Sequence, residues 1–226
     1  MTTMSDEANA PGDTAVESNG AGGAVSARGR ATRARLLAGA RAAILEGDGT
    51  LEVAAVARRA GVSAGLLYRY FAGKDGLVAA VVDDFYDGYD FEVFTTRLDG
   101  ALSWPEREHA RLRREIDFLC DAPLGRMVIG RRLCEPAAAQ TDAQRLARQI
   151  DLAARSIAKA QREGELDGSF SPRFAAAATL GAFRELMAEA LSGDADPPRA
   201  ELLEAMWRVG SSLLLHSPAS ESSSSR

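Results

Sequence analysis

The chain has 226 residues, of which 46% are hydrophobic and 26% charged, and its formal net charge is −5 at pH 7. An acidic total argues against a protein whose whole surface binds nucleic acid, and the lack of any run of about 18 apolar residues argues against a membrane-spanning helix. The chain also lacks the cationic start and apolar core of a signal peptide, and its two cysteines, Cys120 and Cys134, form no CxxC pair. We therefore expect a cytoplasmic protein.

Low-complexity segments lie at both ends. Residues 1–27 contain Ala, Gly, Ser, Thr and acidic residues with almost no large apolar side chain, and residues 217–226 are mostly serine. Neither segment can bury enough apolar surface to offset the entropy lost on ordering. We expect two disordered tails.

The charge is distributed unevenly along the chain. Residues 28–80 contain nine basic and four acidic side chains, whereas the 146 residues that follow contain 18 basic and 24 acidic ones. A basic N-terminal part joined to an acidic body is the pattern expected when only the first part meets phosphates.

Residues 31–47 have the apolar spacing of a helix. Arg28 and Arg30 precede this helix, and Thr32 is expected to cap its N-terminus. Its apolar face consists of Leu36, Leu37, Ala40 and Ile44.

Residues 50–76 contain two short helices separated by a tight turn. The first helix should end at Gly61, which can adopt the left-handed conformation of a C-cap, and Ser63 has the hydroxyl that caps the next helix. Leu67 and Phe71, four residues apart, should lock the second helix across the first. A small, cationic and aromatic outer face is typical of a helix-turn-helix that enters a major groove. That face carries Ala64, Gly65, Tyr68 and Arg69, with Tyr70 and Lys74 at its end.

This stretch resembles the DNA-binding signature of the TetR (tetracycline-repressor) family of bacterial regulators, and the signature covers about a fifth of the chain. The matching residues are Val56-Ala57, Ala60-Gly61-Val62-Ser63, Leu67-Tyr68, Phe71 and Lys74. The resemblance implies a repressor that binds a palindromic double-stranded operator as a homodimer. It also implies release by a small apolar ligand. We expect no cofactor and no metal.

The resemblance further implies which residues contact DNA. Base contacts fall on Ala64, Gly65, Leu66 and Tyr68, and backbone contacts on Arg69, Tyr70, Lys74, Ser63, Thr50 and an arm with Arg28 and Arg30. Ala64 and Leu66 replace commonly polar residues, so few side-chain hydrogen bonds to base edges are expected. DNA shape should then contribute to sequence specificity. Leu66 either meets a thymine methyl group or packs in the core. Glu52 stands where a capping threonine is usual, which leaves Thr50 as the expected cap.

Beyond Lys74 the apolar pattern continues through several turns, which predicts one long helix that links two domains. Helix-breaking residues such as Pro105, Pro123 and Pro136 mark the boundaries of the helices that follow. We expect these helices near residues 104–120, 125–135, 140–163, 171–191 and 198–215. The predicted fold is all-α, with a three-helix DNA-binding head at 28–75 and a ligand-binding and dimerisation body at 76–216.

The last two predicted helices carry a stripe of small and apolar residues suited to a helical interface. Packing within one chain would also explain this stripe, but the resemblance favours a four-helix dimer interface. The expected interface residues are Phe174, Ala178, Gly181, Ala182, Met206, Val209 and Leu213.

Large apolar side chains of the body are candidates for lining a ligand cavity, with Arg131 as a polar anchor. The candidates are Phe85, Trp104, Phe118, Met127, Phe183, Met187 and Trp207. Each would serve equally well in a packed core, so a constitutive regulator without a ligand is the rival hypothesis.

A catalytic function has little support in the sequence. The only histidines, His109 and His216, are far apart and lie in no metal-ligand spacing. Carboxylates in residues 107–117, REHARLRREID, are interleaved with arginines, which is typical of a solvated helix face. A helix-turn-helix that contacts protein would expose large apolar anchors, whereas this one exposes small, basic and phenolic groups. We therefore predict a DNA-binding regulator rather than an enzyme.

Overall fold

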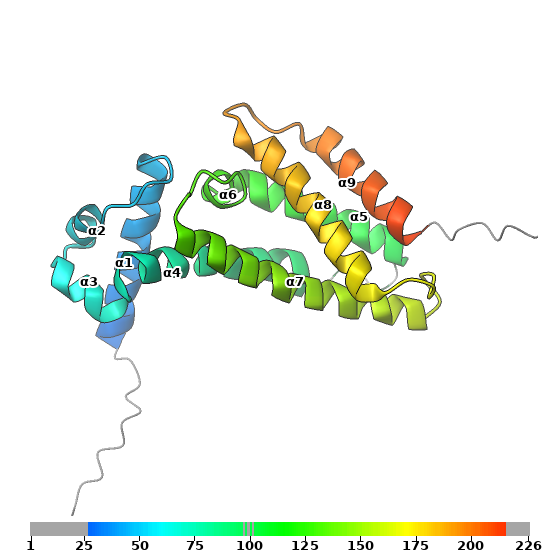
Figure 1. The fold of residues 1–226 in the computed structure, drawn as a ribbon, viewed down its shortest axis with the longest axis horizontal. Helices are drawn as coiled ribbons and strands as arrows, with labels where there is room; N and C mark the ends of the chain where they lie inside the picture. Colours follow the sequence, from blue (N-terminus) through cyan, green and yellow to red (C-terminus); the bar gives the residue numbers. More distant parts are fainter. Residues whose placement is uncertain (1–26, 97, 99, 101, 216–226) are drawn as a thin grey trace, which may run out of the picture.

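The computed structural model describes residues 27–96, 98, 100 and 102–215, and within these residues it contains helices and no strand. α1 (Ala27–Glu46), α2 (Val53–Ala60) and α3 (Ala64–Tyr70) form a head at one end, from which α4 (Gly73–Asp90) runs into the body (Figure 1). After a π-helical turn, η1 (Phe91–Thr95), come α5 (Trp104–Asp121), α6 (Gly125–Val128), α7 (Pro136–Arg162), α8 (Pro172–Ser192) and α9 (Arg199–Leu214). The predicted all-α fold is confirmed. The tails predicted at 1–27 and 217–226 lie, apart from Ala27, outside the described residues.

The head is held together by apolar side chains from all three of its helices. Those that are completely buried include Leu36, Ile44, Val56 and Leu67. α1 begins at Ala27, earlier than predicted, and the Thr32 hydroxyl donates to the Arg28 carbonyl one turn before it, at 3.0 Å. The expected N-cap at Thr32 is therefore wrong, because this residue lies inside the helix.

The turn between α2 and α3 has the geometry expected from its sequence. Gly61 has φ 66°, a left-handed conformation that ends α2, and Ser63 Oγ accepts a hydrogen bond from the Leu66 amide at 3.2 Å. The expected cap at Thr50 is wrong, because Thr50 Oγ1 donates to the Gly47 carbonyl at 2.7 Å instead. The orientation of α3 is thus fixed from its first residue.

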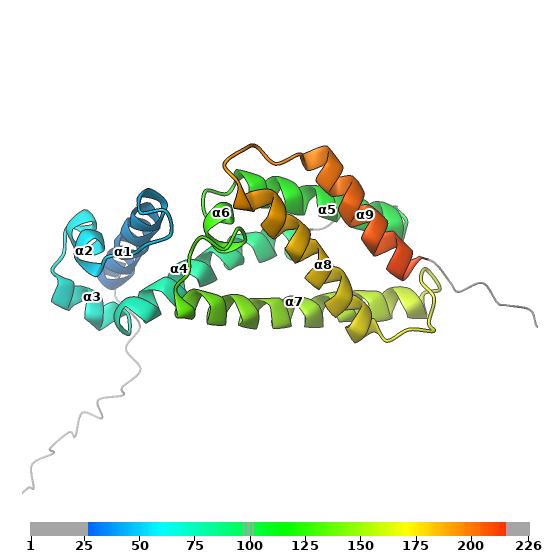
Figure 2. The same cartoon turned by 45° about the horizontal axis from the view of Figure 1, so that its top comes forward.

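α4 connects head and body as one continuous helix, as predicted. It packs against α1 near its start and against α7 within the body (Figure 2). Its buried side chains are Leu77, Val78, Val81, Val82, Phe85, Tyr86 and Tyr89. α4 is therefore packed into both the head and the body.

Most of the body consists of α5, α7, α8 and α9, together with the part of α4 that enters it. α8 packs on α7, and α9 packs on both α8 and α5. The helix predicted at 125–135 is wrong beyond Val128. A Cβ at Gly130 would lie 2.5 Å from the Arg126 carbonyl oxygen, and Arg131 has φ 60°, so the chain turns there. α7 then begins at Pro136, because proline is tolerated in the first turn of a helix.

Among the described helices, none is long and apolar enough to cross a membrane.

Candidate functional site

The outer face of α3 lies at the surface of the head. Tyr68 is 57% exposed, whereas Leu67, on the opposite face, is completely buried and holds the helix in place. Leu66 is half-buried, so both roles considered for it stay open. The other exposed residues of this face are Ala64, Gly65 and Arg69, and Tyr70 is half-buried at the end of the helix.

The residues expected to meet the DNA backbone differ in their surroundings. Arg28 and Arg30 are exposed at the start of α1, and Thr50 is exposed before α2. Lys74, in contrast, bridges head and body: its Nζ lies 2.7 Å from Oε1 of Glu135, the residue that precedes α7. A phosphate contact by Lys74 must therefore replace this ion pair.

An apolar surface covers the outer sides of α8 and α9. Phe174 is 77% exposed, Val209 and Leu213 also reach solvent, and a side chain added at Gly181 would meet open space. Ala178 is exposed and Ala182 half-buried. Met206 is completely buried within its own chain, so its assignment to a dimer interface is wrong. The buried stripe of α9 recurs every four residues, at Leu202, Met206, Gly210 and Leu214.

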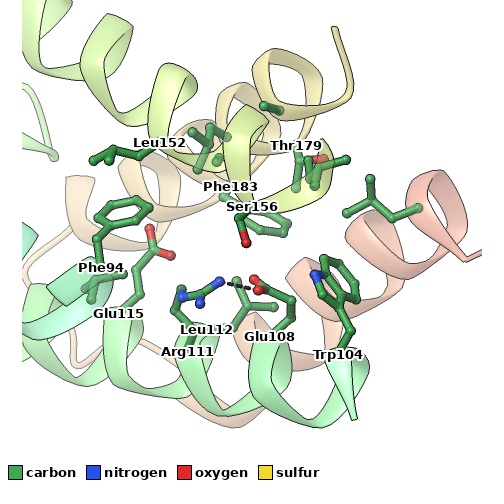
Figure 3. A pocket seen from close by; sticks show the side chains of 16 residues that line it. Phe94, Trp104, Glu108, Arg111, Leu112, Glu115, Leu152, Ser156, Thr179 and Phe183 are labelled. Carbon is green, nitrogen blue, oxygen red and sulfur yellow. Dashed lines mark hydrogen bonds and ion pairs between the residues drawn. The ribbon is translucent and has the colours of Figure 1, made fainter. Parts of the chain in front are cut away.

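The body contains a cavity of about 190 Å³. Residues from α5 form one wall, and residues from α7 and α8 form the opposite one, with contributions from η1 and α9 (Figure 3). Most of the lining is apolar and includes Phe94, Leu112, Leu152, Ile157 and Phe183. The polar side chains are Glu108, Arg111, Glu115, Ser156 and Thr179.

Of the eight residues expected at a ligand cavity, Trp104 and Phe183 line this one. The aromatic rings of Phe85 and Phe118 lie 6.0 Å apart in the core, and Met127 is buried in α6. Met187 borders a much smaller space beside Tyr86, and Trp207 packs on His109. Arg131 is wrong as a cavity anchor, because it lies at the surface in an ion pair with Glu185.

Glu115 was missed by the sequence analysis, which placed residues 107–117 on a solvated face. It is only 7% exposed, and the Tyr89 hydroxyl donates to its Oε1 at 2.8 Å. Burial raises the pKa of Glu115 to about 7, although the Tyr89 hydrogen bond and the Arg111 charge both act to lower it. Nearby, Arg111 forms an ion pair with Glu108 across the cavity floor (Figure 3).

The raised pKa of Glu115 predicts a pH-dependent stability. Because the folded protein holds the proton more tightly than the unfolded chain, this contribution is complete below about pH 4.5 and is lost as the pH rises to about 7. We expect the melting temperature to fall between pH 5 and pH 7.5, and to fall less in Glu115→Gln, which keeps the Tyr89 hydrogen bond. Calorimetry measures both, with the exposed Glu189→Gln as the control. An equal fall in all three proteins would exclude Glu115 as the source.

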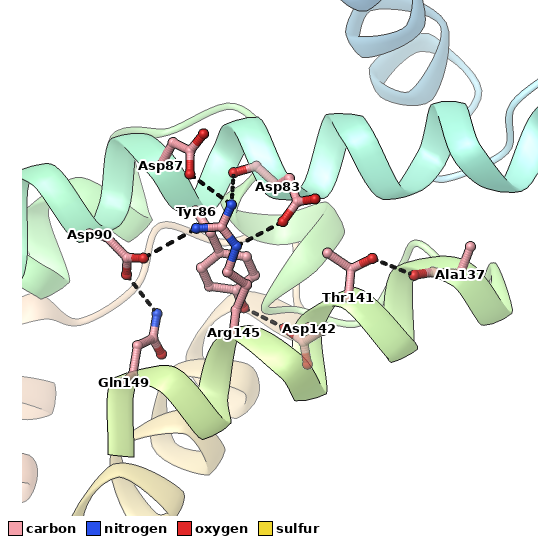
Figure 4. A network of polar contacts seen from close by, with 9 residues as sticks. All are labelled: Asp83, Tyr86, Asp87, Asp90, Ala137, Thr141, Asp142, Arg145 and Gln149. Carbon is pink, nitrogen blue, oxygen red and sulfur yellow. Dashed lines mark hydrogen bonds and ion pairs between the residues drawn. The ribbon is translucent and has the colours of Figure 1, made fainter. Parts of the chain in front are cut away.

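A second buried charge ties α4 to α7. The Arg145 guanidinium lies 2.8 Å from Asp83, 2.7 Å from Asp87 and 3.3 Å from Asp90, three aspartates on one face of α4 (Figure 4). Gln149, one turn further along α7, donates to Asp90 at 3.0 Å. This network joins α4, the helix that carries the head, to α7.

Comparison with known protein families finds one match, in the N-terminal part of the chain. The sequence profile described as "Bacterial regulatory proteins, tetR family" matches residues 36–81, which span the end of α1, the helix-turn-helix and the first half of α4. This part of the chain is a TetR-type DNA-binding domain. Among proteins with curated functions, none matches this sequence.

Several solved structures share the fold over most of the chain. A protein from Mesorhizobium loti assigned to the family is 21% identical, with a TM-score of 0.65, and the match covers 83% of this chain and 97% of the other. One from Rhodococcus sp. is 25% identical, with a TM-score of 0.58 and coverage of 80% and 98%. SmeT, the repressor of the multidrug efflux pump SmeDEF in Stenotrophomonas maltophilia, is 18% identical, with a TM-score of 0.66 and coverage of 81% and 92%.

Proposed function

We propose that this protein is a cytoplasmic transcriptional repressor that binds a palindromic operator as a homodimer and is released when a small molecule fills the body cavity. The observation that carries the DNA-binding part is the outer face of α3, which presents small side chains, a tyrosine and an arginine beside a Ser63-capped N-terminus. A helix of this kind can approach base edges closely because no large side chain stands in front of its first turn.

The proposed contacts divide between base edges and the DNA backbone. Ala64, Gly65, Leu66 and Tyr68 face the bases, while Arg69 and Tyr70 face phosphates on the flank. Arg28 and Arg30 are placed to reach the backbone or minor groove from the start of α1. The head, residues 28–75, carries DNA binding, and the body, residues 76–216, carries the ligand and the dimer interface.

The cavity supports a ligand-responsive regulator over the constitutive rival. Protein interiors are close-packed, and a space of about 190 Å³ exceeds an ordinary packing defect. Its walls come from helices that pack against α4 or against its partners, so filling it can shift α4 and with it the spacing of two α3 helices in a dimer. That spacing must match the groove repeat of about 34 Å.

A catalytic role is not proposed. Residues 61–65 read G-x-S-x-G, the spacing of a nucleophile elbow, but such an elbow joins a strand to a helix. Here the serine lies between two helices and caps α3. In the described part of the chain, no group of His, Cys, Asp and Glu is arranged to hold a metal ion.

The proposal is tested by recovering the genomic fragments that the purified protein retains and footprinting them. We expect protection of a two-fold symmetric site, and its loss in Tyr68→Ala. Retention of fragments without a shared symmetric sequence would contradict the proposed function.

The ion pair between Lys74 and Glu135 gives a prediction about electrostatics. If Lys74 meets a phosphate on binding, Glu135→Gln should strengthen binding to all DNA sequences, because the lysine no longer has to leave a carboxylate. Lys74→Ala should weaken binding uniformly and lower the slope of log K against log salt by about one counterion. Filter binding across a salt series measures both.

The double variant provides the control. Once Lys74 is absent, Glu135→Gln should have no further effect on DNA binding. A salt slope that Lys74→Ala leaves unchanged would remove Lys74 from the DNA interface.

A further inference from the structure

The polar groups of the body cavity define what it can bind, an inference that rests on the proposed ligand response. One face of α5 supplies Trp104, Glu108, Arg111 and Glu115, and the apolar wall from α7 and α8 faces them (Figure 3). Arg111 is the only cation among the lining residues, and its charge is already paired with Glu108. Glu115 has no cationic partner of its own among the hydrogen bonds and ion pairs of the described residues.

An anionic ligand is disfavoured by this arrangement. A carboxylate or phosphate would have to enter a space bounded by two carboxyl groups, and it would have to displace Glu108 from Arg111 to find a counter-charge. A cation meets the opposite situation, because the buried carboxyl of Glu115 gains a partner when a positive group enters. Phe94 lines the same cavity as Glu115 and is an aromatic ring, a group that attracts cations to its face.

The size and the remaining polar atoms of the cavity narrow the choice. A cavity of about 150 Å³ holds benzene, so about 190 Å³ accommodates one aromatic ring with a short chain. Trp104 Nε1 and Thr179 Oγ1 are buried and have no hydrogen-bond partner within the described residues, and both residues line the cavity. A hydroxyl group on the ligand can satisfy one of these atoms.

We infer that the cavity binds a small arylalkylamine, a molecule with one hydroxylated aromatic ring and a short protonated amine, whose ammonium group pairs with Glu115. The ring lies among Phe94, Leu112 and Phe183, and Glu115 is ionised in the complex. The groups that face Glu115 are Tyr89 from α4, Glu108 and Arg111 from α5, and Arg184 from α8. Both cations of this set already have a carboxylate partner, Arg111 in Glu108 and Arg184 in Asp142. The ammonium group of the ligand therefore supplies the direct ion pair that Glu115 lacks.

Binding should therefore be linked to protons. Because the pKa of Glu115 is raised to about 7 in the free protein, this carboxyl is mostly protonated at pH 6 and mostly ionised at pH 8. The amine stays charged throughout, so its affinity should rise about tenfold between these two pH values, with release of a proton at the lower one.

The test compares three probes that share a ring and differ in charge: 2-(4-hydroxyphenyl)ethylamine, 2-(4-hydroxyphenyl)ethanol and (4-hydroxyphenyl)acetate. Isothermal titration of the full chain at pH 6 and pH 8 gives the affinity and, in buffers of different ionisation enthalpy, the protons released. We expect the amine to bind at least tenfold tighter than the other two at pH 8. Glu115→Gln should abolish this preference and flatten the pH dependence, while the exposed Glu189→Gln retains both.

Several results would overturn the inference. These are tightest binding of the acetate, equal binding of alcohol and amine with a flat pH profile, an unchanged preference in Glu115→Gln, or no binding of any probe. Operator retention, measured in parallel, separates this inference from the proposed function. If the alcohol or the acetate releases operator DNA, the proposed function holds and the arylalkylamine assignment fails. If the amine binds as expected but the protein retains no specific DNA, the arylalkylamine assignment holds and the proposed function fails.

Discussion

Arg145→Met is expected to lower the free energy of unfolding by about 2 kcal/mol and the melting temperature by about 6 °C. Methionine keeps much of the buried stem but removes the guanidinium that faces three aspartates of α4. Removing one partner of a fully buried ion pair costs about 3–5 kcal/mol. The loss here is smaller because Asp87 stays largely exposed and can be hydrated again. Chemical denaturation measures the change.

The matched control for this variant lies on the same helix. Arg148 is exposed on α7, so Arg148→Met makes the same chemical change outside the network and should alter stability by less than about 0.5 kcal/mol. Similar losses in the two variants would mean that the network contributes nothing beyond a surface charge. Repulsion along α4 also predicts that Arg145→Met destabilises the protein. Without Arg145, the charges of Asp83, Asp87 and Asp90 repel one another along one face of the helix.

The helix-turn-helix was predictable from sequence because its determinants are local. Gly61 and Ser63 end one helix and start the next through their own backbone and side-chain geometry, whatever the rest of the chain does. Pro172 and the Pro197-Pro198 pair similarly mark the boundaries of α8 and α9. Local signals of this kind located most of the fold and the exposed face of α3.

The body site was not predictable because its determinants are distant in sequence. Glu115 belongs to a segment whose alternating charges are typical of a solvated face, but α4 packs on α5 and brings Tyr89, 26 residues away in sequence, into hydrogen bond with it. Arg145 meets its aspartates 55 to 62 residues away. Met206 was assigned to the dimer interface from the apolar pattern of the last helix and the family resemblance, whereas the direction in which its side chain points depends on the rotation of α9 against α5 and α8.

The outer surface of α8 and α9 leads to the prediction with the largest effect on function. Gly181→Glu combined with Ala178→Glu is expected to convert a homodimer into monomers and to weaken operator binding at least about 100-fold. A dimer places its second α3 helix at the adjacent half-site at a high effective concentration, and this tethering contributes about 10²–10⁴ in affinity. Monomers lose this gain without the loss of any single DNA contact.

The positions of these two substitutions separate an effect on dimerisation from an effect on folding. Ala178 is exposed and a side chain at Gly181 meets open space, so neither glutamate disturbs the fold of one chain. In a dimer that buries Phe174, Val209 and Leu213, two carboxylates facing their two-fold mates would be desolvated beside like charges. Sedimentation gives the mass and a fluorescence titration gives the operator affinity, with Ala143→Glu and Ala147→Glu on the exposed side of α7 as the control pair. A variant that sediments as a dimer and binds the operator normally would place the interface elsewhere, and a monomeric parent protein would exclude dimerisation altogether.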